Sequence, residues 1–402
     1  MHARRERFLD LEALTLAGVV FNYQKSSHAG GKGWGLSMRK SVAVAILLLL
    51  CARMSASATV LAEESPHPPQ PPAAPRSLQI TSQVKLPPEF NRARDLRWAS
   101  DNSVYLALGA NGVSEVSLNP PNQQIREMVP GRFKPGGFIV SNQLAVSSQY
   151  LVAAGFGIAF TWRRLADATR SEDAVDYIQA VDVWNDRLLL VGGRRDDQGF
   201  ATDGAIAWTG SLDKKLADLK PILYAASGSG AREMNACGSV HLGAARFFED
   251  GSFLIFPGVQ PGLSIYDRDG KLQKTWDTAS LGLYIDCSSL SPEAITQIKL
   301  NYPARMAWVN QRRTVDTILM LPQGPGLVIR GVENGRVQWQ LQVLTPAGQV
   351  ITHQLPIEAP DEFYHLRGDT RSGKLVFLLF QTPPSDNNYP QPYLITALAP
   401  EG

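Results

Sequence analysis

A short pattern recurs six times along most of this 402-residue chain. Each copy has a polar turn, often with Asp or Gly, then an apolar run and then, in most copies, Gly or Pro. The copies read "WASDNSVYLALG" from Trp98, "LAVSSQYLVAAG" from Leu144, "VWNDRLLLVGG" from Val183, "FFEDGSFLIFPG" from Phe247, "LPQGPGLVIRG" from Leu321 and "GDTRSGKLVFLLF" from Gly368. Short apolar runs bounded by turn residues are typical of β-strands. The pattern therefore predicts an all-β chain built from repeated hairpins.

Most copies are followed by a third strand. These read "VSEVSLN", "IAFTWRRL", "AIAWTGSL", "LSIYDRDGKLQKTW" and "VQWQLQVLTPAGQVITHQL", and the last two contain hairpin turns that lead into a fourth strand. Six four-stranded units at spacings of about 40–70 residues are typical of a β-propeller. We predict a single six-bladed β-propeller with four-stranded antiparallel blades. The alternative is a pair of tandem β-sandwiches.

In this repeat pattern, residues 77–400 resemble the six-bladed β-propellers of the NHL and TolB-like kind, of the secreted bacterial type. The resemblance lies in the repeats and not in a subfamily motif. A ring of blades avoids a free strand edge when both termini contribute to one blade. "SLQITSQVKLP" precedes the first copy, and the last copy has only three strands. We therefore expect Leu78–Leu86 to close the last blade as its outer strand.

Two insertions flank the fourth repeat. In the second one, Ser291-Pro292-Glu293 provides an N-cap, a first-turn proline and an acidic first turn, which predicts one short helix from Pro292 to about Leu300. Each insertion holds one cysteine, Cys237 and Cys287. An even number of cysteines in an oxidising compartment favours a disulfide between them. The alternative is a pair of unpaired thiols.

The segment "MRKSVAVAILLLLCARMSASATVLA" from Met38 has a basic start, a short apolar run and small residues at its end. The apolar run is shorter than the roughly 20 residues of a membrane-spanning helix. This pattern predicts a secretory signal peptide at residues 38–58, cleaved after Ala58, with Ala62 as the second choice. We therefore expect a periplasmic or secreted protein.

The residues on either side of this segment have a different character. We expect translation to start at Met38, so that residues 1–37 are an upstream extension; the alternative is a long basic start of the signal. Residues 59–76 include "EESPHPPQPPAAPR", which reads as an extended Pro-rich linker. Residues 77–400 then form the propeller domain.

Composition excludes several classes of function. A net charge of +2 argues against a nucleic-acid partner, and no second apolar run has membrane length. The chain has no CxxC pair, no GxSxG motif and no complete phosphate-binding GxxxxGK[ST] motif. We therefore assign no catalytic residues, no metal ligands and no cofactor, and we expect a monomer.

Two long polar loops stand between the second and third strands of the third and sixth repeats, at residues 192–204 and 381–392. Polar loops on a rigid scaffold are common binding sites. The candidate binding residues are Arg194, Arg195, Asp196, Asp197, Asp386, Asn387, Asn388 and Tyr389. Because these repeats are opposite in a six-bladed ring, we expect the arginine pair to face Asp386 and Tyr389 across the channel. An arginine pair suits a carboxylate-bearing partner.

Two functions follow from these features. The first is an exported, non-catalytic binding module for a protein or glycan partner at one propeller face. The second is an enzyme similar to the six-bladed lactonases and related hydrolases, which the resemblance implies would hold calcium in the channel. Its acidic candidates are Asp95, Asp182, Glu249 and Asp369. Because these four residues have no common register, we favour the binding module.

Overall fold

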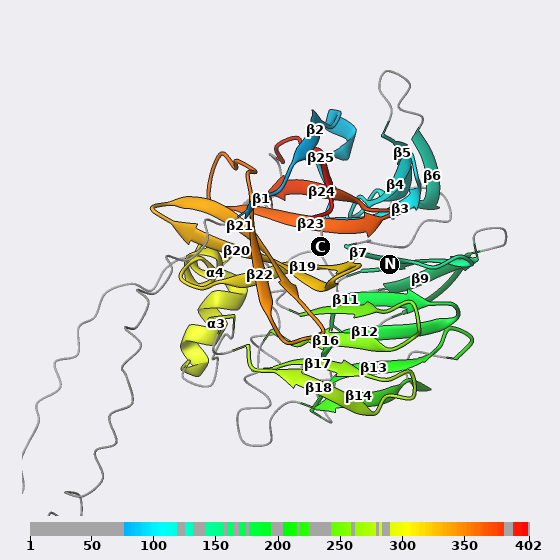
Figure 1. Ribbon diagram of the computed structural model, residues 1–402. Coiled ribbons are helices and arrows are strands. Elements are labelled where there is room, and N and C mark those ends of the chain that lie inside the picture. Colours follow the sequence, from blue (N-terminus) through cyan, green and yellow to red (C-terminus); the bar gives the residue numbers. More distant parts are fainter. Residues whose placement is uncertain are drawn as a thin grey trace, which may run out of the picture. The chain divides into compact units, whose positions relative to one another are not determined.

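The computed structural model describes residues 76–118, 125–131, 142–155, 159–164, 169–173, 177–193, 204–214, 218–224, 243–258, 262–278, 281–283, 290–381 and 389–400. These residues belong to one compact unit, Pro72–Gly402. Within it, the described strands form six sheets around a common axis (Figure 1). Neighbouring strands of each sheet are antiparallel, apart from one short parallel pair described below.

The sheets follow one another in chain order. The first holds β3 (Asp95–Ser100), β4 (Ser103–Ala107), β5 (Gly112–Ser117) and β6 (Ile125–Pro130). The second holds β7 (Gln143–Val146), β8 (Tyr150–Ala154), β9 (Ala159–Arg164) and β10 (Thr169–Asp173). The third holds β11 (Tyr177–Trp184), β12 (Arg187–Gly193), β13 (Ala205–Ser211) and β14 (Lys220–Tyr224).

The fourth holds β15 (Ala244–Phe247), β16 (Phe253–Phe256), β17 (Leu263–Tyr266) and β18 (Leu272–Trp276). The fifth holds β19 (Thr314–Leu321), β20 (Gly324–Glu333), β21 (Arg336–Leu344), β22 (Val350–Leu355) and the short β1 (Arg76–Ser77). The sixth holds β23 (Tyr364–Arg371), β24 (Lys374–Gln381), β25 (Tyr393–Leu398) and β2 (Ile80–Lys85).

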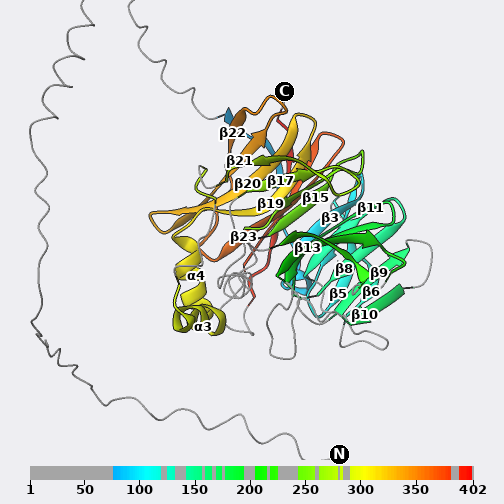
Figure 2. The same cartoon turned by 90° about the horizontal axis from the view of Figure 1, so that it is seen from below.

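The first strand of each sheet lies innermost. These strands contact one another in a closed circle, β3 with β7, β7 with β11, β11 with β15, β15 with β19, β19 with β23, and β23 with β3. Figure 2 shows the same unit turned by 90°, with the sheets splayed around these inner strands. Sheets that radiate from a ring of inner strands make a β-propeller. The predicted propeller class is confirmed, and the sandwich alternative does not fit a closed circle of strands.

Each repeated pattern of the sequence spans the first hairpin of its sheet. Trp98 pairs with Val104 in the first sheet, and Phe247 pairs with Phe253 in the fourth. At Ser372-Gly373, between β23 and β24, both residues have positive φ, 50° and 73°. Such backbone angles match the twist of the flanking strands in a two-residue hairpin turn. The local turn residues therefore determine where these strands end.

The apolar faces pack between neighbouring sheets. The largest such cluster joins the fifth and sixth sheets and contains Trp339, Leu366 and Phe377, all fully buried. A similar cluster joins the sixth sheet to the first, through Phe380 and Leu96. The second strands of the sheets, such as β4, β16 and β24, are covered on both sides and therefore read as almost continuous apolar runs.

The N-terminal segment closes the ring as predicted. β2 pairs antiparallel with β25, so that the sixth sheet has the order β2-β25-β24-β23. Leu78 and Leu86, at the two ends of this segment, are 5% and 1% exposed. The sequence did not predict β1, which pairs in parallel with β22 of the fifth sheet before the chain crosses to the sixth. Residues of the N-terminal segment therefore pair with strands of two adjacent sheets, the fifth and the sixth.

The second insertion contains two helices rather than one. α3 (Pro292–Leu300) has the predicted bounds, and the Ser291 hydroxyl accepts a hydrogen bond from the Ala294 N–H at 3.2 Å. α4 (Tyr302–Asn310) follows directly, with Asn301 as its N-cap. A single 3₁₀ turn, Pro88–Phe90, precedes β3. None of the described helices is long and apolar enough to cross a membrane. Cys237 and Cys287 lie outside the described residues, so their disulfide stays a prediction.

Candidate functional site

Charged side chains lie at the centre of the ring. They come from the inner strands of the first, third, fourth and sixth sheets. We call Asp95, Arg97, Asp182, Arg246 and Asp369 the channel cluster. Arg97 pairs with Asp95 at 3.0 Å, and Arg246 pairs with Asp182 at 3.7 Å and with Asp369 at 3.5 Å. Asp95 and both arginines are buried, with at most 7% exposure.

Arg246 makes the longest-range contacts of this cluster. It extends from β15 of the fourth sheet, and its Nε donates to the Ile318 carbonyl of the fifth sheet at 3.0 Å. Its Nη2 donates to the Gly368 carbonyl of the sixth sheet at 3.2 Å. One side chain therefore joins the third, fourth, fifth and sixth sheets across the channel.

The carboxylates also hold neighbouring sheets together through the backbone. Asp95 accepts from the Leu144 N–H at 2.7 Å. Asp182 accepts from the N–H of Phe247 at 2.7 Å, and Asp369 from the N–H of Trp98 at 3.0 Å. In each case an aspartate on one inner strand binds an amide on the next strand of the ring. Charge-assisted hydrogen bonds of this kind are stronger than neutral ones.

Burial shapes the protonation of this cluster. Burial raises the pKa of the Asp182 carboxyl, even though Arg246 and Arg97 act in the opposite direction. Burial disfavours the charged form of Arg97 as well, but Asp95 and Asp369 outweigh it and raise the pKa of this guanidinium. The pKa of Arg246 is lowered by burial and by the nearby Arg97. The cluster is thus a set of mutually dependent charges.

This arrangement bears on the calcium alternative. Asp95, Asp182 and Asp369 do converge on the channel, but arginines and backbone amides occupy their oxygens. Glu249 is exposed on the turn between β15 and β16, outside the channel. Calcium requires six to eight oxygen ligands. Within the described ranges, no group of three His, Cys, Asp or Glu residues is placed to hold a metal. The channel aspartates are arranged for guanidinium and amide groups instead.

A second group of side chains lies at the end of the channel where the inner strands begin. Arg92 and Arg94 precede β3, and Tyr389 precedes β25. The Arg92 guanidinium carbon is 5.3 Å from the centre of the Tyr389 ring, and that of Arg94 is 4.7 Å from it. Arg94 is also 5.7 Å from the centre of the Phe380 ring. We call these four residues the mouth cluster.

A histidine borders the mouth cluster. The ring of His365, on β23, is 5.9 Å from that of Phe380. Its Nδ1 is 3.4 Å from a carboxylate oxygen of Asp316 on β19. The indole Nε1 of Trp339 donates to the other oxygen of Asp316 at 2.9 Å, as does the Leu366 N–H. Burial lowers the pKa of the His365 imidazole despite the nearby Asp316. Burial therefore favours the neutral form of this imidazole.

The structure describes only part of the predicted binding site. Tyr389 lies against Arg92 and Arg94, two residues that the sequence analysis did not select. The other candidates lie outside the described residues: Arg194, Arg195, Asp196, Asp197, Asp386, Asn387 and Asn388. The contact across the channel thus stays a prediction. A local signal for Arg92 and Arg94 was present in the sequence. The segment "NRARD" just before a strand alternates so that its two arginines lie on the same side of the chain.

No protein-family model matches the chain, and no curated protein matches it. Solved structures similar to it include a streptogramin B lyase structure, with 10% identity over 79% of this chain and 97% of that chain and a TM-score of 0.43. The WD40 β-propeller domain of Doa1 has 11% identity over 80% of this chain and 97% of that chain, with a TM-score of 0.40. A chain of the Mitotic Checkpoint Complex has 7% identity over 87% of this chain and 100% of that chain, with a TM-score of 0.42.

Proposed function

We propose that this chain is an exported, non-catalytic β-propeller, with the six sheets as its blades, that binds a carboxylate-bearing protein or glycan at one face. The mouth cluster is the observation that carries this proposal. It places two guanidinium groups against one tyrosine at the end of the channel. The channel cluster fills the space below it, so a partner must be held on the face rather than in the channel.

The chemistry of the mouth cluster fits a carboxylate. A guanidinium stacked on an aromatic ring has its ring-side face occupied, while its N–H groups lie in its own plane. The Arg94 Nη1 donates to the Ala93 carbonyl at 2.9 Å, which orients the plane of that group. A planar fork of this kind matches the two oxygens of a carboxylate. Tyrosine and arginine are also enriched among residues that dominate binding energy at interfaces. Arg92, Arg94 and Tyr389 therefore form the centre of the proposed binding face.

The loops at 192–204 and 381–392 would extend this face. They follow the second strands of the third and sixth sheets, which lie opposite each other in the circle of inner strands. On this proposal, Arg194 and Arg195 add a second arginine pair on the far side of the channel. Export through the signal at 38–58 would bring this face to the periplasm or the medium, where a Cys237–Cys287 disulfide can persist.

The test uses the mature protein as bait for an envelope extract. We expect Arg92→Gln with Arg94→Gln to lose the partners that the wild type recovers, because both guanidinium forks are removed. The matched control is Arg126→Gln with Arg268→Gln, which removes the same charge from exposed positions outside the mouth cluster. Both double variants should melt within a few degrees of the wild type, as surface changes usually do. Recovery of every partner by the mouth variant would refute the proposal.

A further inference from the structure

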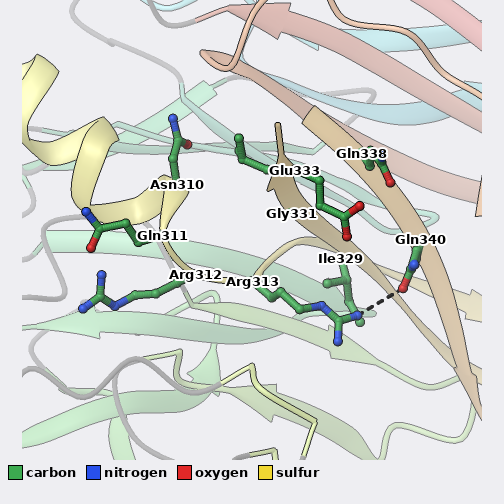
Figure 3. A pocket seen from close by; sticks show the side chains of 10 residues that line it. Asn310, Gln311, Arg312, Arg313, Ile329, Gly331, Glu333, Gln338 and Gln340 are labelled. Atoms are coloured by element: carbon green, nitrogen blue, oxygen red, sulfur yellow. Dashed lines mark hydrogen bonds between the residues drawn. The ribbon is translucent and has the colours of Figure 1, made fainter. Parts of the chain in front are cut away.

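A small cavity lies beside the fifth sheet, between the end of α4 and the β20–β21 hairpin (Figure 3). Its volume is about 150 Å³. It is lined by Asn310, Gln311, Arg312, Arg313, Ile329, Gly331, Val332, Glu333, Gln338 and Gln340. Arg313 immediately precedes the inner strand β19, so the cavity opens at the same end of the propeller as the mouth cluster, but on different residues. Most of its lining is polar, which favours a polar ligand.

Gly331 lines the cavity at a position where the backbone conformation would also accept other residues. Gly331 lies inside β20, and its φ is outside the left-handed region. A Cβ at this position would meet only the Arg313 Cγ, at 3.9 Å, which is ordinary contact. Glycine weakens a strand, and in a strand interior it often marks a place where a ligand approaches closely. Gly331 therefore keeps open a space that a larger residue could fill.

The two arginines of the lining extend in opposite directions, Arg313 toward Gln340 and Arg312 away from it (Figure 3). The Arg313 guanidinium donates to the Leu281 carbonyl at 3.2 Å and to Gln340 Oε1 at 3.1 Å, which fixes its position (Figure 3). Arg312 lies over the Trp308 ring at 4.3 Å and donates to the Trp308 carbonyl. In the described part of the chain, neither arginine has a carboxylate within ion-pair distance. Arg313 thus brings a fixed positive charge to the side of the cavity that holds Gln340 and Glu333.

Asn310 adds an unused donor. Its Oδ1 accepts from Arg330 at 2.8 Å, which orients the amide and directs the Nδ2 group elsewhere. That Nδ2 is buried and has no acceptor among the described residues. A buried donor without a partner is unfavourable, so such a group indicates a ligand or water beside it. The Asn310 amide lies on the opposite side of the lining from the Arg313 guanidinium (Figure 3). Glu333, at the hairpin end of the same cavity, supplies the opposite charge.

We propose that this cavity binds a carboxylate with an adjacent N–H or ammonium group, the chemistry shared by a free α-amino acid and the C-terminal residue of a peptide. Arg313 binds the carboxylate, and Glu333 accepts from the nitrogen. Gly331 leaves room for the ligand backbone. This site goes beyond the proposed partner-binding face and does not depend on it, because it uses none of the mouth-cluster residues.

Titration calorimetry with three probes tests the site. Glycine represents the free amino acid, N-acetylglycine the peptide C-terminus, and N-acetylglycine methyl ester lacks the carboxylate. We expect at least one of the two acids to bind, and the ester to bind at least tenfold more weakly than N-acetylglycine. Preference for glycine or for N-acetylglycine identifies the source of the carboxylate. Absence of binding by both acids, or equal binding of N-acetylglycine and its ester, would overturn the proposal.

Variants at two positions of the cavity, with one control outside it, test whether the probes bind in this cavity. Gly331→Val fills the cavity, and Arg313→Gln removes the fixed guanidinium; each should weaken the binding acid at least tenfold. Arg336→Gln removes an equal charge from the same hairpin, outside this cavity, and should change affinity less than twofold. Gly331→Ala gives a smaller steric change if the valine variant is poorly folded. Unchanged affinity in both Arg313→Gln and a folded Gly331 variant would refute the site. The mouth variant should bind the probes normally, which separates this site from the partner-binding face.

Discussion

At the scale of single residues, Arg246 is the best example of a side chain whose partners are far away in sequence. It binds groups on three other sheets, including the carboxylates of Asp182 and Asp369. Removing one member of a buried ion pair leaves an uncompensated charge, which typically destabilises a protein by about 3–5 kcal/mol. Arg246 therefore acts as a stabilising crosslink of the ring.

We predict that Arg246→Met lowers the free energy of unfolding by about 3–5 kcal/mol, measured by urea denaturation. Adding Asp182→Asn to this variant should recover part of the loss, because the remaining buried charge is removed. The exposed pair of Arg371 and Asp101, at 2.7 Å, provides the control. Arg371→Met should change stability by less than about 1 kcal/mol. Equal effects of the two arginine substitutions would contradict the crosslinking role.

His365 gives a prediction about pH. Burial lowers its pKa below the ordinary value of 6.5, so below that pH the unfolded chain binds more protons at this site than the folded chain does. The contribution of His365 to stability is therefore present above pH 6.5 and is lost as the pH falls through the lowered pKa. We expect the melting temperature of His365→Gln to fall less than that of the wild type as the pH is lowered from 7. Parallel pH profiles for the two proteins would exclude this linkage.

Residue-scale prediction from the sequence was limited to local signals. Tyr389 was predicted because it lies in the long polar loop at 381–392; the structure places it against two arginines, and its role in binding stays a prediction. Arg97 and Arg246 were missed because they lie inside strands, where an isolated charge has no local signature. Their partners include Asp369, which is more than 100 residues away along the chain. Only the closed ring brings these charges together.

At the scale of elements, boundaries with a local chemical cause were predictable. α3 begins at Pro292 because Ser291 caps it, and both residues are visible in the sequence. α4 was missed although its N-cap, Asn301, is of an equally suitable type. Because Asn301 also ends α3, the sequence at this point was interpreted as the end of one helix and not as the junction of two. β1 was missed because a two-residue parallel strand depends on the free edge of β22.

At the scale of the whole molecule, the circle of strands depends on one N-terminal segment. β2 completes the sixth sheet, with Val84 paired to Leu394 and Gln83 to Ile395. Without it, β25 would present an unpaired edge, and Leu378 and other core residues beneath it would lose part of their cover. Exposed strand edges are sites of aggregation. Closure by this segment therefore contributes to the stability of the ring.

We predict that deleting residues 77–86 produces aggregation or a markedly lower melting temperature, measured by scanning fluorimetry and size-exclusion chromatography. The matched control deletes residues 63–75, which removes the Pro-rich segment and spares β1 at Arg76–Ser77. This control should melt like the chain without a deletion. Leu86→Ala separates side-chain packing from strand pairing: Leu86 is 1% exposed, and its truncation should cost about 2–5 kcal/mol without aggregation, because the edge of β25 stays covered. Equal melting temperatures for the two deletions would mean that the ring holds together without its closing strand.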